Sequence, residues 1–406
     1  MFEKKIEHFQ GYAQQLRPIG MNMEKVWPYH GSSTTAGAIH PIQYLDWYIP
    51  RLQQMRKYNL SYSGLQYVWD FEKYLGQSLS DVGYHHIPSF ANSEQMVADR
   101  YGVKAENVVI THGATQALNI ALLSCIDSTD SEKNTVAVEL PAYAPVVQTP
   151  LLLNCDTIPV QRHPPVDGIG PWRINKNEWL DVLQKSKVLM ITPQLNPCGW
   201  DYESSDRKWI IDTCKQMSIT IISDEVYIDS MKGTDDYKPF HLEGNHCISV
   251  NSLTKIYGLG PLRFGWIIAN EEISLNAKRA FLTLSGMMAS PTIRLASAVF
   301  PHLDLAIEKI KQYREINLPV LRDMLARQNI AWNEPPYGVF GAFKLPNEYD
   351  SIKFVDGPCA DNSVLAIPGS MFSEELGGWL RVAWSIEPKL FSEAILNLEK
   401  ALISIQ

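Results

Sequence analysis

The middle of the chain alternates short runs of apolar, often β-branched residues with longer amphipathic stretches. The longer stretches include residues 115–126 and 203–217, where the apolar positions recur with helical spacing. Near-continuous apolar strands that alternate with helices are typical of a largely parallel sheet covered on both faces, a three-layer α/β/α arrangement. The seven expected strands are residues 107–111, 135–139, 156–160, 188–192, 219–224, 247–252 and 264–269.

Beyond about residue 275 the pattern changes to a long helical region followed by shorter strand-like pieces. The pieces are residues 339–345, 363–369 and 379–385, and they predict a smaller α+β domain. The first ninety residues are rich in proline, glycine and aromatic residues, and their pattern favours neither helix nor strand.

The chain is therefore expected to have a large domain and a small one. We predict that residues 61–290 form the large domain and that residues 291–406 form the small C-terminal α+β domain. Residues 1–60 are predicted to be an N-terminal segment that contributes to the small domain and to a substrate pocket. A length of 406 residues agrees with this division, since single cores rarely grow so large.

The composition and charge of the chain indicate which kinds of binding partner to expect. Hydrophobic residues make up 45% of the chain and charged residues 20%, which is ordinary for a globular protein. The formal net charge of −8 gives no basis for expecting nucleic acid as a partner. The N-terminal sequence MFEKKIEHFQ is polar, and no uninterrupted apolar stretch is long enough for a bilayer. We therefore expect no signal peptide, no membrane partner and a cytoplasmic location.

The cysteines and histidines do not predict a metal site. The six cysteines have irregular spacing without a CxxC pair, and the ten histidines form no HExxH motif. His85 and His86 are adjacent rather than one helical turn apart. Neither a disulfide scaffold nor a bound metal is expected.

Polar residues follow the ends of the expected strands, and each has an ordinary alternative explanation. Gly113 opens a helix, where free N–H groups suit a phosphate, although a turn alone also needs glycine. Tyr143 follows the next strand and could stack on a planar cofactor or fill the core. Asn196 stands before a proline in a tight turn, or directs its amide to a ligand oxygen.

The next strand ends add charged groups. Asp224 closes an apolar strand, where a carboxylate requires a cation or a donor, which could be a protonated ring nitrogen or an arginine. Tyr227 follows it, and the next strand leads to Ser252, Lys255 and Arg263. Together, five successive strands end in groups that a phosphorylated heteroaromatic cofactor needs.

With these residues in place, the chain resembles the fold type I pyridoxal-5′-phosphate (PLP) enzymes of the class I/II aminotransferase family. The resemblance extends from about Val108 to Ala269 and resumes at residues 379–385. Its most specific part is the stretch S-x-T-K-x-x-G-x-x-x-x-R-x-G, which begins at Ser252. The ordered set of Asn196, Asp224 and Tyr227 supports it.

The resemblance implies a role for each position. Lys255 would form the Schiff base with PLP, and Asp224 would pair with the pyridinium nitrogen. Further implied contacts are Asn196 and Tyr227 on the phenolic oxygen; Ser252, Arg263, Ala114 and Thr115 on the phosphate; Tyr143 on the ring; Arg381 on the substrate α-carboxylate; and Tyr62 on the phosphate of a neighbouring subunit. A homodimer with shared active sites is implied as well.

The chain departs from the family pattern at several places. Cys198 stands where threonine is usual, and the segment before the phosphate loop is longer and carries His85 and His86. The N-terminal stretch also differs, and His30 or His40 could approach a substrate there or lie on the surface.

These departures concern the reaction type, because one cofactor supports several chemistries on one fold. We expect transamination between an L-amino acid and a 2-oxo acid, with Lys255 transferring the proton. The alternative is a PLP-dependent lyase or cyclase of a specialised biosynthetic pathway. A PLP-binding regulator without activity is a third possibility, which the intact set of Lys255, Asp224 and Arg381 disfavours. The substrate side chain is not predicted.

Overall fold

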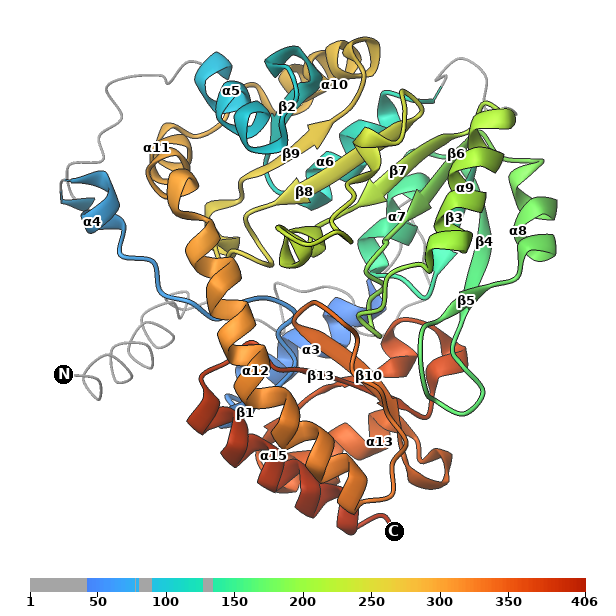
Figure 1. The fold of residues 1–406 in the computed structure, drawn as a ribbon, viewed down its shortest axis with the longest axis vertical. Coiled ribbons are helices and arrows are strands. Elements are labelled where there is room, and N and C mark those ends of the chain that lie inside the picture. The colour runs from blue at the N-terminus through green and yellow to red at the C-terminus, as the bar shows by residue number, and fades with distance from the viewer. Residues whose placement is uncertain (1–41, 77, 80–89, 127–133) are drawn as a thin grey trace. The chain divides into compact units, whose positions relative to one another are not determined.

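Eight strands form a mostly parallel sheet in the part of the chain that the structure, a computed structural model, describes: residues 42–76, 78–79, 90–126 and 134–406 (Figure 1). The strands are β2 (Val108–Thr111), β3 (Thr135–Leu140), β4 (Asp156–His163), β5 (Arg173–Ile174), β6 (Val188–Ile191), β7 (Thr220–Asp224), β8 (Cys247–Ser252) and β9 (Gly265–Ile268). Their order across the sheet is β2-β9-β8-β7-β6-β3-β4-β5. Strand β9 is antiparallel to both of its neighbours, and β5 is antiparallel to β4.

The seven strands expected from the sequence are confirmed, and β5 is an eighth that the prediction missed. Strand β5 has only two residues at the edge of the sheet, which is too short to show an apolar alternation. The expected fold class is otherwise correct.

Helices cover both faces of this sheet, as a parallel sheet requires. Alternate residues of β6 separate the two layers: Val188 and Met190 belong to one apolar cluster, while Leu189 and Ile191 belong to another. The first cluster includes residues of α5 (Phe90–Tyr101), α6 (Ala114–Leu123), α7 (Ala144–Leu152), α10 (Glu271–Ser285) and α11 (Ser290–Val299). The second includes residues of α8 (Lys176–Leu183) and α9 (Ser204–Gln216).

A second, three-stranded antiparallel sheet has the order β10-β13-β12. Its elements are β10 (Phe340–Lys344), β12 (Ile367–Pro368) and β13 (Trp379–Ala383), accompanied by α12 (Asp304–Arg327), α13 (Ser351–Asp356), α14 (Pro358–Asp361) and α15 (Pro388–Ile403). The expected strand at 363–369 is divided at Ala366, because β11 (Val364–Leu365) pairs with β1 (Tyr58–Asn59) while β12 pairs with β13. The predicted boundaries between domains stay a prediction.

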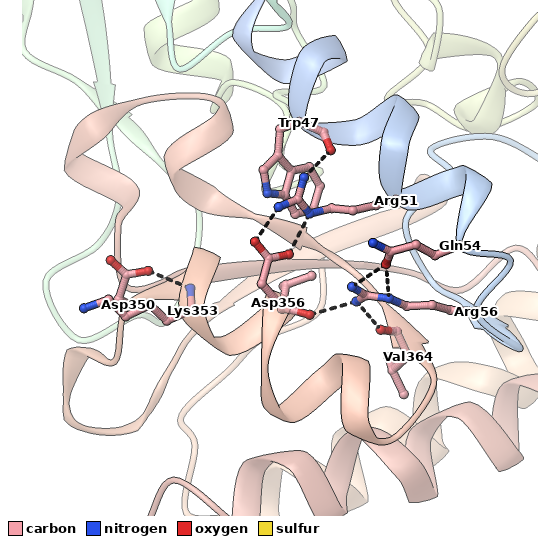
Figure 2. A network of polar contacts seen from close by, with 9 residues as sticks. Trp47, Arg51, Gln54, Arg56, Asp350, Lys353, Asp356 and Val364 are labelled. Atoms are coloured by element: carbon pink, nitrogen blue, oxygen red, sulfur yellow. Dashed lines mark hydrogen bonds and ion pairs between the residues drawn. The ribbon is translucent and has the colours of Figure 1, made fainter. Parts of the chain in front are cut away.

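The early part of the chain is attached to this second sheet region through polar contacts. Helix α3 (Gln43–Gln53) carries Arg51, which binds both carboxylate oxygens of Asp356 at the end of α13 (Figure 2). Arg56 donates to the carbonyl oxygens of Val355 and Val364 at 2.8 and 3.0 Å. These contacts join positions about three hundred residues apart, and they explain why local sequence pattern did not assign this region.

Asp70 caps helix α4 (Phe71–Leu75), and its side chain accepts a hydrogen bond from the Lys73 N–H. Within the ranges that the structure describes, no helix combines the length and the apolar character needed to cross a membrane.

Candidate functional site

A cavity lies where the carboxyl ends of the parallel strands meet, the edge at which ligands of such sheets bind. Strand β9 reaches the same edge with its first residue because it runs in the opposite direction. The residues lining the cavity are Ala114, Thr115, Leu118, Tyr143, Thr192, Asn196, Asp224, Val226, Tyr227, Ser252, Thr254, Lys255 and Arg263. The structure therefore brings together every residue that was predicted to bind a cofactor, except Tyr62.

Lys255 lies buried at this cavity. Its Nζ donates to Ser63 Oγ at 3.0 Å and lies 5.8 Å from the centre of the Tyr143 ring. Burial lowers the pKa of Lys255 to about 8, helped by the charges of Arg381 and Arg263 and opposed by that of Asp224. A much larger fraction of the amine is therefore neutral near pH 7 than for an ordinary lysine, which is the form that attacks a carbonyl carbon.

Asp224 is the last residue of β7, and its carboxylate is buried at the same cavity. The Val226 N–H donates to it at 3.4 Å, and no lysine or arginine of the described residues forms an ion pair with it. Burial raises the pKa of Asp224 to about 6, and the Val226 N–H and the Lys255 charge oppose the shift. A buried carboxylate without an ion-pair partner favours a cationic ligand beside it.

The start of α6 forms an anion-binding end of the cavity. Its N-cap, Gly113, has no side chain to satisfy the first N–H groups, and Ala114 and Thr115 line the cavity. Arg263 lies alongside in a left-handed conformation with φ 49°, and its Nη2 donates to the His112 carbonyl at 3.3 Å. Free N–H groups, the helix dipole and a guanidinium are together suited to a phosphate.

Gly113 leaves room for this arrangement. It has φ +82°, and a Cβ placed on it would lie 2.5 Å from Nη2 of Arg263. Gly265 is similarly close, because its Cβ would lie 2.6 Å from the Gly113 carbonyl carbon. Any side chain at either position would therefore displace the groups that form the phosphate end of the cavity.

Arg381 comes from the other sheet, on β13, and it does not line this cavity. It is fully buried; its Nη1 donates to Asn196 Oδ1 at 2.9 Å and its Nη2 to the Ser61 carbonyl, while Nε has no partner. No carboxylate of the described residues pairs with it. Asn196 lines the cavity and also accepts from Arg381, so it connects Arg381 with the cavity. A buried guanidinium with a free N–H can bind a carboxylate.

The tyrosines differ in position. Tyr143 and Tyr227 line the cavity, and burial raises the pKa of both, that of Tyr143 to about 12. Tyr62 lies outside the lining set, with its hydroxyl 3.4 Å from the Thr254 carbonyl and its ring centre 5.9 Å from Lys255 Nζ. Its predicted contact with a neighbouring subunit stays a prediction.

A sequence model of the family described as "Aminotransferase class I and II" matches residues 60–396. The chain belongs to this family. Class I and II aminotransferases are enzymes that use PLP, and this aminotransferase is accordingly an enzyme of the transaminase class.

Individual relatives of this aminotransferase are distant. The chain is 24% identical to an aspartate aminotransferase from Pyrococcus horikoshii over 74% of this chain and 77% of the relative. It is 23% identical to aromatic-amino-acid aminotransferase 2 from Thermococcus litoralis over 82% of this chain and 87% of the relative. A crystal structure of an aminotransferase from Mycobacterium tuberculosis superposes with a TM-score of 0.79 at 19% identity, covering 92% of this chain and all of the other, which shows the same fold.

Several residues of the aminotransferase site were missed from the sequence. Thr192, Val226 and Thr254 line the cavity beside predicted positions, and Ser63 receives the hydrogen bond of Lys255. Thr192, Val226 and Thr254 could have been found from the sequence, because each lies within two residues of the end of a predicted strand. Ser63 could not, since its contact with Lys255 spans 192 positions.

The departures from the family pattern have different outcomes. Cys198 is buried and does not line the cavity, and burial raises the pKa of its thiol to about 12. It is therefore protonated near neutral pH and unsuited to react there. His30, His40, His85 and His86 lie outside the described residues.

Gly113→Ala is expected to weaken PLP binding at least ~10-fold, because the added Cβ meets the Arg263 guanidinium in the phosphate end. The matched control is Gly102→Ala, whose backbone has a similar φ of +68° with nothing within 4 Å of the added Cβ. Both variants should lose comparable stability, so thermal unfolding and PLP titration of each separate strain from binding. Equal PLP affinity in the two variants would reject this assignment of the phosphate end.

Proposed function

We propose that this chain binds PLP covalently through Lys255 and exchanges amino groups between an L-amino acid and a 2-oxo acid. The observation that carries the proposal is that a buried amine, Lys255, and a buried carboxyl group, Asp224, line the same cavity. Lys255 has its pKa lowered to about 8, and Asp224 has no ion-pair partner among the described residues. Clusters of such perturbed groups in a cavity are typical of catalytic sites.

The residues fit the parts of PLP. The start of α6 with Ser252 and Arg263 suits its phosphate, and Asp224 suits its protonated ring nitrogen. Lys255 suits its aldehyde carbon, and Tyr143 presents an aromatic ring beside that amine. Within the described residues, no group of His, Cys, Asp and Glu side chains has an arrangement able to hold a metal ion.

PLP, when bound, supplies an electron sink that stabilises negative charge at the substrate α-carbon. The buried Asp224 carboxylate would keep the ring nitrogen protonated by direct Coulomb attraction. With the substrate in the cavity, Lys255 Nζ would accept the α-proton and return a proton to the product. Arg381 holds the α-carboxylate and so fixes which bond at the α-carbon breaks.

The lowered pKa of Lys255 predicts how the protein without cofactor captures PLP. Because only the neutral amine attacks an aldehyde, the capture rate should rise ~10-fold per pH unit below about pH 8 and level off above it. Stopped-flow absorbance of PLP mixed with the cofactor-free protein measures this rate. A profile that still rises toward the ordinary lysine pKa of 10.5 would contradict the described environment of Nζ.

Arg381→Lys is expected to lower kcat/KM for an amino acid by about 10²–10³-fold, because an ammonium cannot form the planar two-bond contact with a carboxylate. The reaction of an amine that lacks the carboxylate should change much less in the same variant. Arg322→Lys is a matched control, since Arg322 binds Glu334 through two nitrogens at an exposed site. Equal losses for the amino acid and the simple amine would show that Arg381 does not bind the carboxylate.

The reaction type is tested by supplying an amino acid without a 2-oxo acid. A transaminase converts one equivalent of amino acid per active site and stops until a 2-oxo acid is added. Continuous release of ammonia or of a cyclised product would instead establish the lyase or cyclase alternative. A panel of amino acids run in this way also identifies the substrate side chain.

A homodimer is part of the proposal, supported by the resemblance to family members that share residues between subunits. A cytoplasmic location is also part of the proposal. Analytical ultracentrifugation of the full chain tests the homodimer. A measured mass equal to one chain would reject shared active sites.

A further inference from the structure

A buried carboxylate, Asp229, lies near the cavity without being part of its lining. It follows β7 in the short 3-10 helix η4 (Ile228–Met231). The hydroxyl groups of Tyr101 and Tyr237 donate to it at 2.6 and 3.0 Å, and Asn251 Nδ2 donates at 2.9 Å. No lysine or arginine of the described residues forms an ion pair with it, so neutral donors alone satisfy this carboxylate.

Asp229 determines how the Asn251 amide is oriented. An ionised carboxylate only accepts hydrogen bonds, so the NH₂ group of Asn251 must face it. Nδ2 of Asn251 also donates to the Tyr101 hydroxyl at 3.2 Å, which adds to the same preference. The carbonyl oxygen of this amide then faces the opposite way and accepts the Ser252 N–H at 2.7 Å.

This chain of contacts ends at the phosphate end of the cavity. Ser252 is the last residue of β8, it lines the cavity, and its Oγ accepts the Thr254 N–H at 3.3 Å. Lys255 is the next residue along. The orientation of one amide outside the cavity therefore fixes the backbone from which Ser252 and Lys255 project.

Tyr257, two residues after Lys255, is also held by hydrogen bonds. The Tyr257 hydroxyl accepts from Arg100 Nη2 at 3.1 Å, and its carbonyl accepts from Trp69 Nε1 at 2.7 Å. Burial and the charge of Asp229 together hold the pKa of Tyr257 well above its ordinary value. Residues 252–257 are thus held on both sides of Lys255 by buried polar contacts.

We propose that Asp229 is a positioning residue that acts through Asn251 to hold Ser252 for the phosphate of PLP. The inference depends on the proposed function, since it assigns the phosphate to this end of the cavity. A residue that only supported the fold would weaken every ligand of the cavity alike. A residue that positions Ser252 should affect the phosphate selectively.

The test compares PLP with pyridoxal, which lacks the phosphate, as ligands of the full chain stripped of cofactor. Asp229→Asn allows the two facing amides to flip and should weaken PLP binding ~10-fold, comparable with one hydrogen bond to a charged group. Pyridoxal affinity should stay within ~2-fold in the same variant, since it lacks the phosphate that Ser252 would contact. Absorbance titration of each ligand gives both dissociation constants without reference to turnover.

Two further variants distinguish an effect transmitted through Asn251 to Ser252 from a general loss of stability. Asn251→Ala should reproduce the selective loss, and the double variant should lose no more than either single one, because both changes interrupt one path. Tyr237→Phe is the matched control, since Tyr237 contacts Asp229 but not Asn251. It should leave the ratio of the PLP and pyridoxal affinities unchanged.

Equal weakening of PLP and pyridoxal in Asp229→Asn and Asn251→Ala would overturn the positioning role while leaving PLP binding by the wild type intact. If Asp229→Asn does not fold, Asn251→Ala and Tyr101→Phe test the same path, since Tyr101 contacts both side chains. A wild-type chain that binds neither ligand would instead refute the proposed function itself.

Discussion

Lys255→Ala is expected to reduce kcat by about 10⁴-fold or more, because the proton transfer at the substrate α-carbon loses its base. The covalent absorbance band of bound PLP should disappear as well, since no other buried amine lines the cavity among the described residues. PLP should still bind, more weakly, through the phosphate end. Absorbance spectra and single-turnover rates of the purified variant measure both effects.

Two controls separate chemistry from packing at Lys255. Lys232→Ala removes a partly buried lysine whose pKa is also lowered by burial but which lies outside the cavity, and it should retain activity. A small amine added in solution should restore part of the Lys255→Ala rate, because it can accept the proton in place of Nζ. Full activity of Lys255→Ala without added amine would refute the assignment.

Asp224→Asn is expected to lower kcat by about 10³-fold, equivalent to about 4 kcal/mol of transition-state stabilisation. The amide has nearly the shape of the carboxylate but carries no charge, so it cannot hold a ring nitrogen in its protonated form. The same change should stabilise the cofactor-free protein slightly, because a buried charge is removed from a place without an ion pair. Rates of the half-reaction and chemical unfolding of each protein measure the two effects.

Glu225→Gln is the matched control for Asp224→Asn. Glu225 is the neighbouring buried carboxyl, it does not line the cavity, and its Oε1 accepts the Phe240 N–H at 2.7 Å. Burial raises the pKa of Glu225 to about 8, so that glutamine resembles the form that prevails near neutral pH. Its half-reaction rate should stay within ~3-fold of the wild type, since no charge at the cavity changes. Comparable losses in both variants would contradict a specific role for Asp224.

The sequence predicted the large sheet and most of the cavity because both depend on local features. Strands such as β2, β6 and β7 are largely apolar runs, and the polar residues that follow the parallel strands lie at one edge of the sheet. Asp224 and Ser252 are the last residues of β7 and β8, so finding the strand located the residue. Two-residue strands such as β5 carry no such pattern.

Contacts between residues far apart in the sequence could not be predicted from local sequence patterns. Ser63 and Ser61 reach Lys255 and Arg381 across 192 and 320 positions, and neither serine has a pattern that distinguishes it. The same is true of Asp229, which ends no strand and was not singled out from the sequence. Its relation to Asn251 depends on the folded arrangement of η4 beside β8.

Reduction of the purified enzyme with borohydride, followed by digestion and mass spectrometry of the peptides, tests the covalent assignment most directly. Reduction makes the bond between PLP and its lysine permanent, so the modified residue is identified without measuring activity. We expect a phosphopyridoxyl group on Lys255 at one per chain. Modification of another lysine, or of none in protein supplied with PLP, would contradict the role of this buried amine.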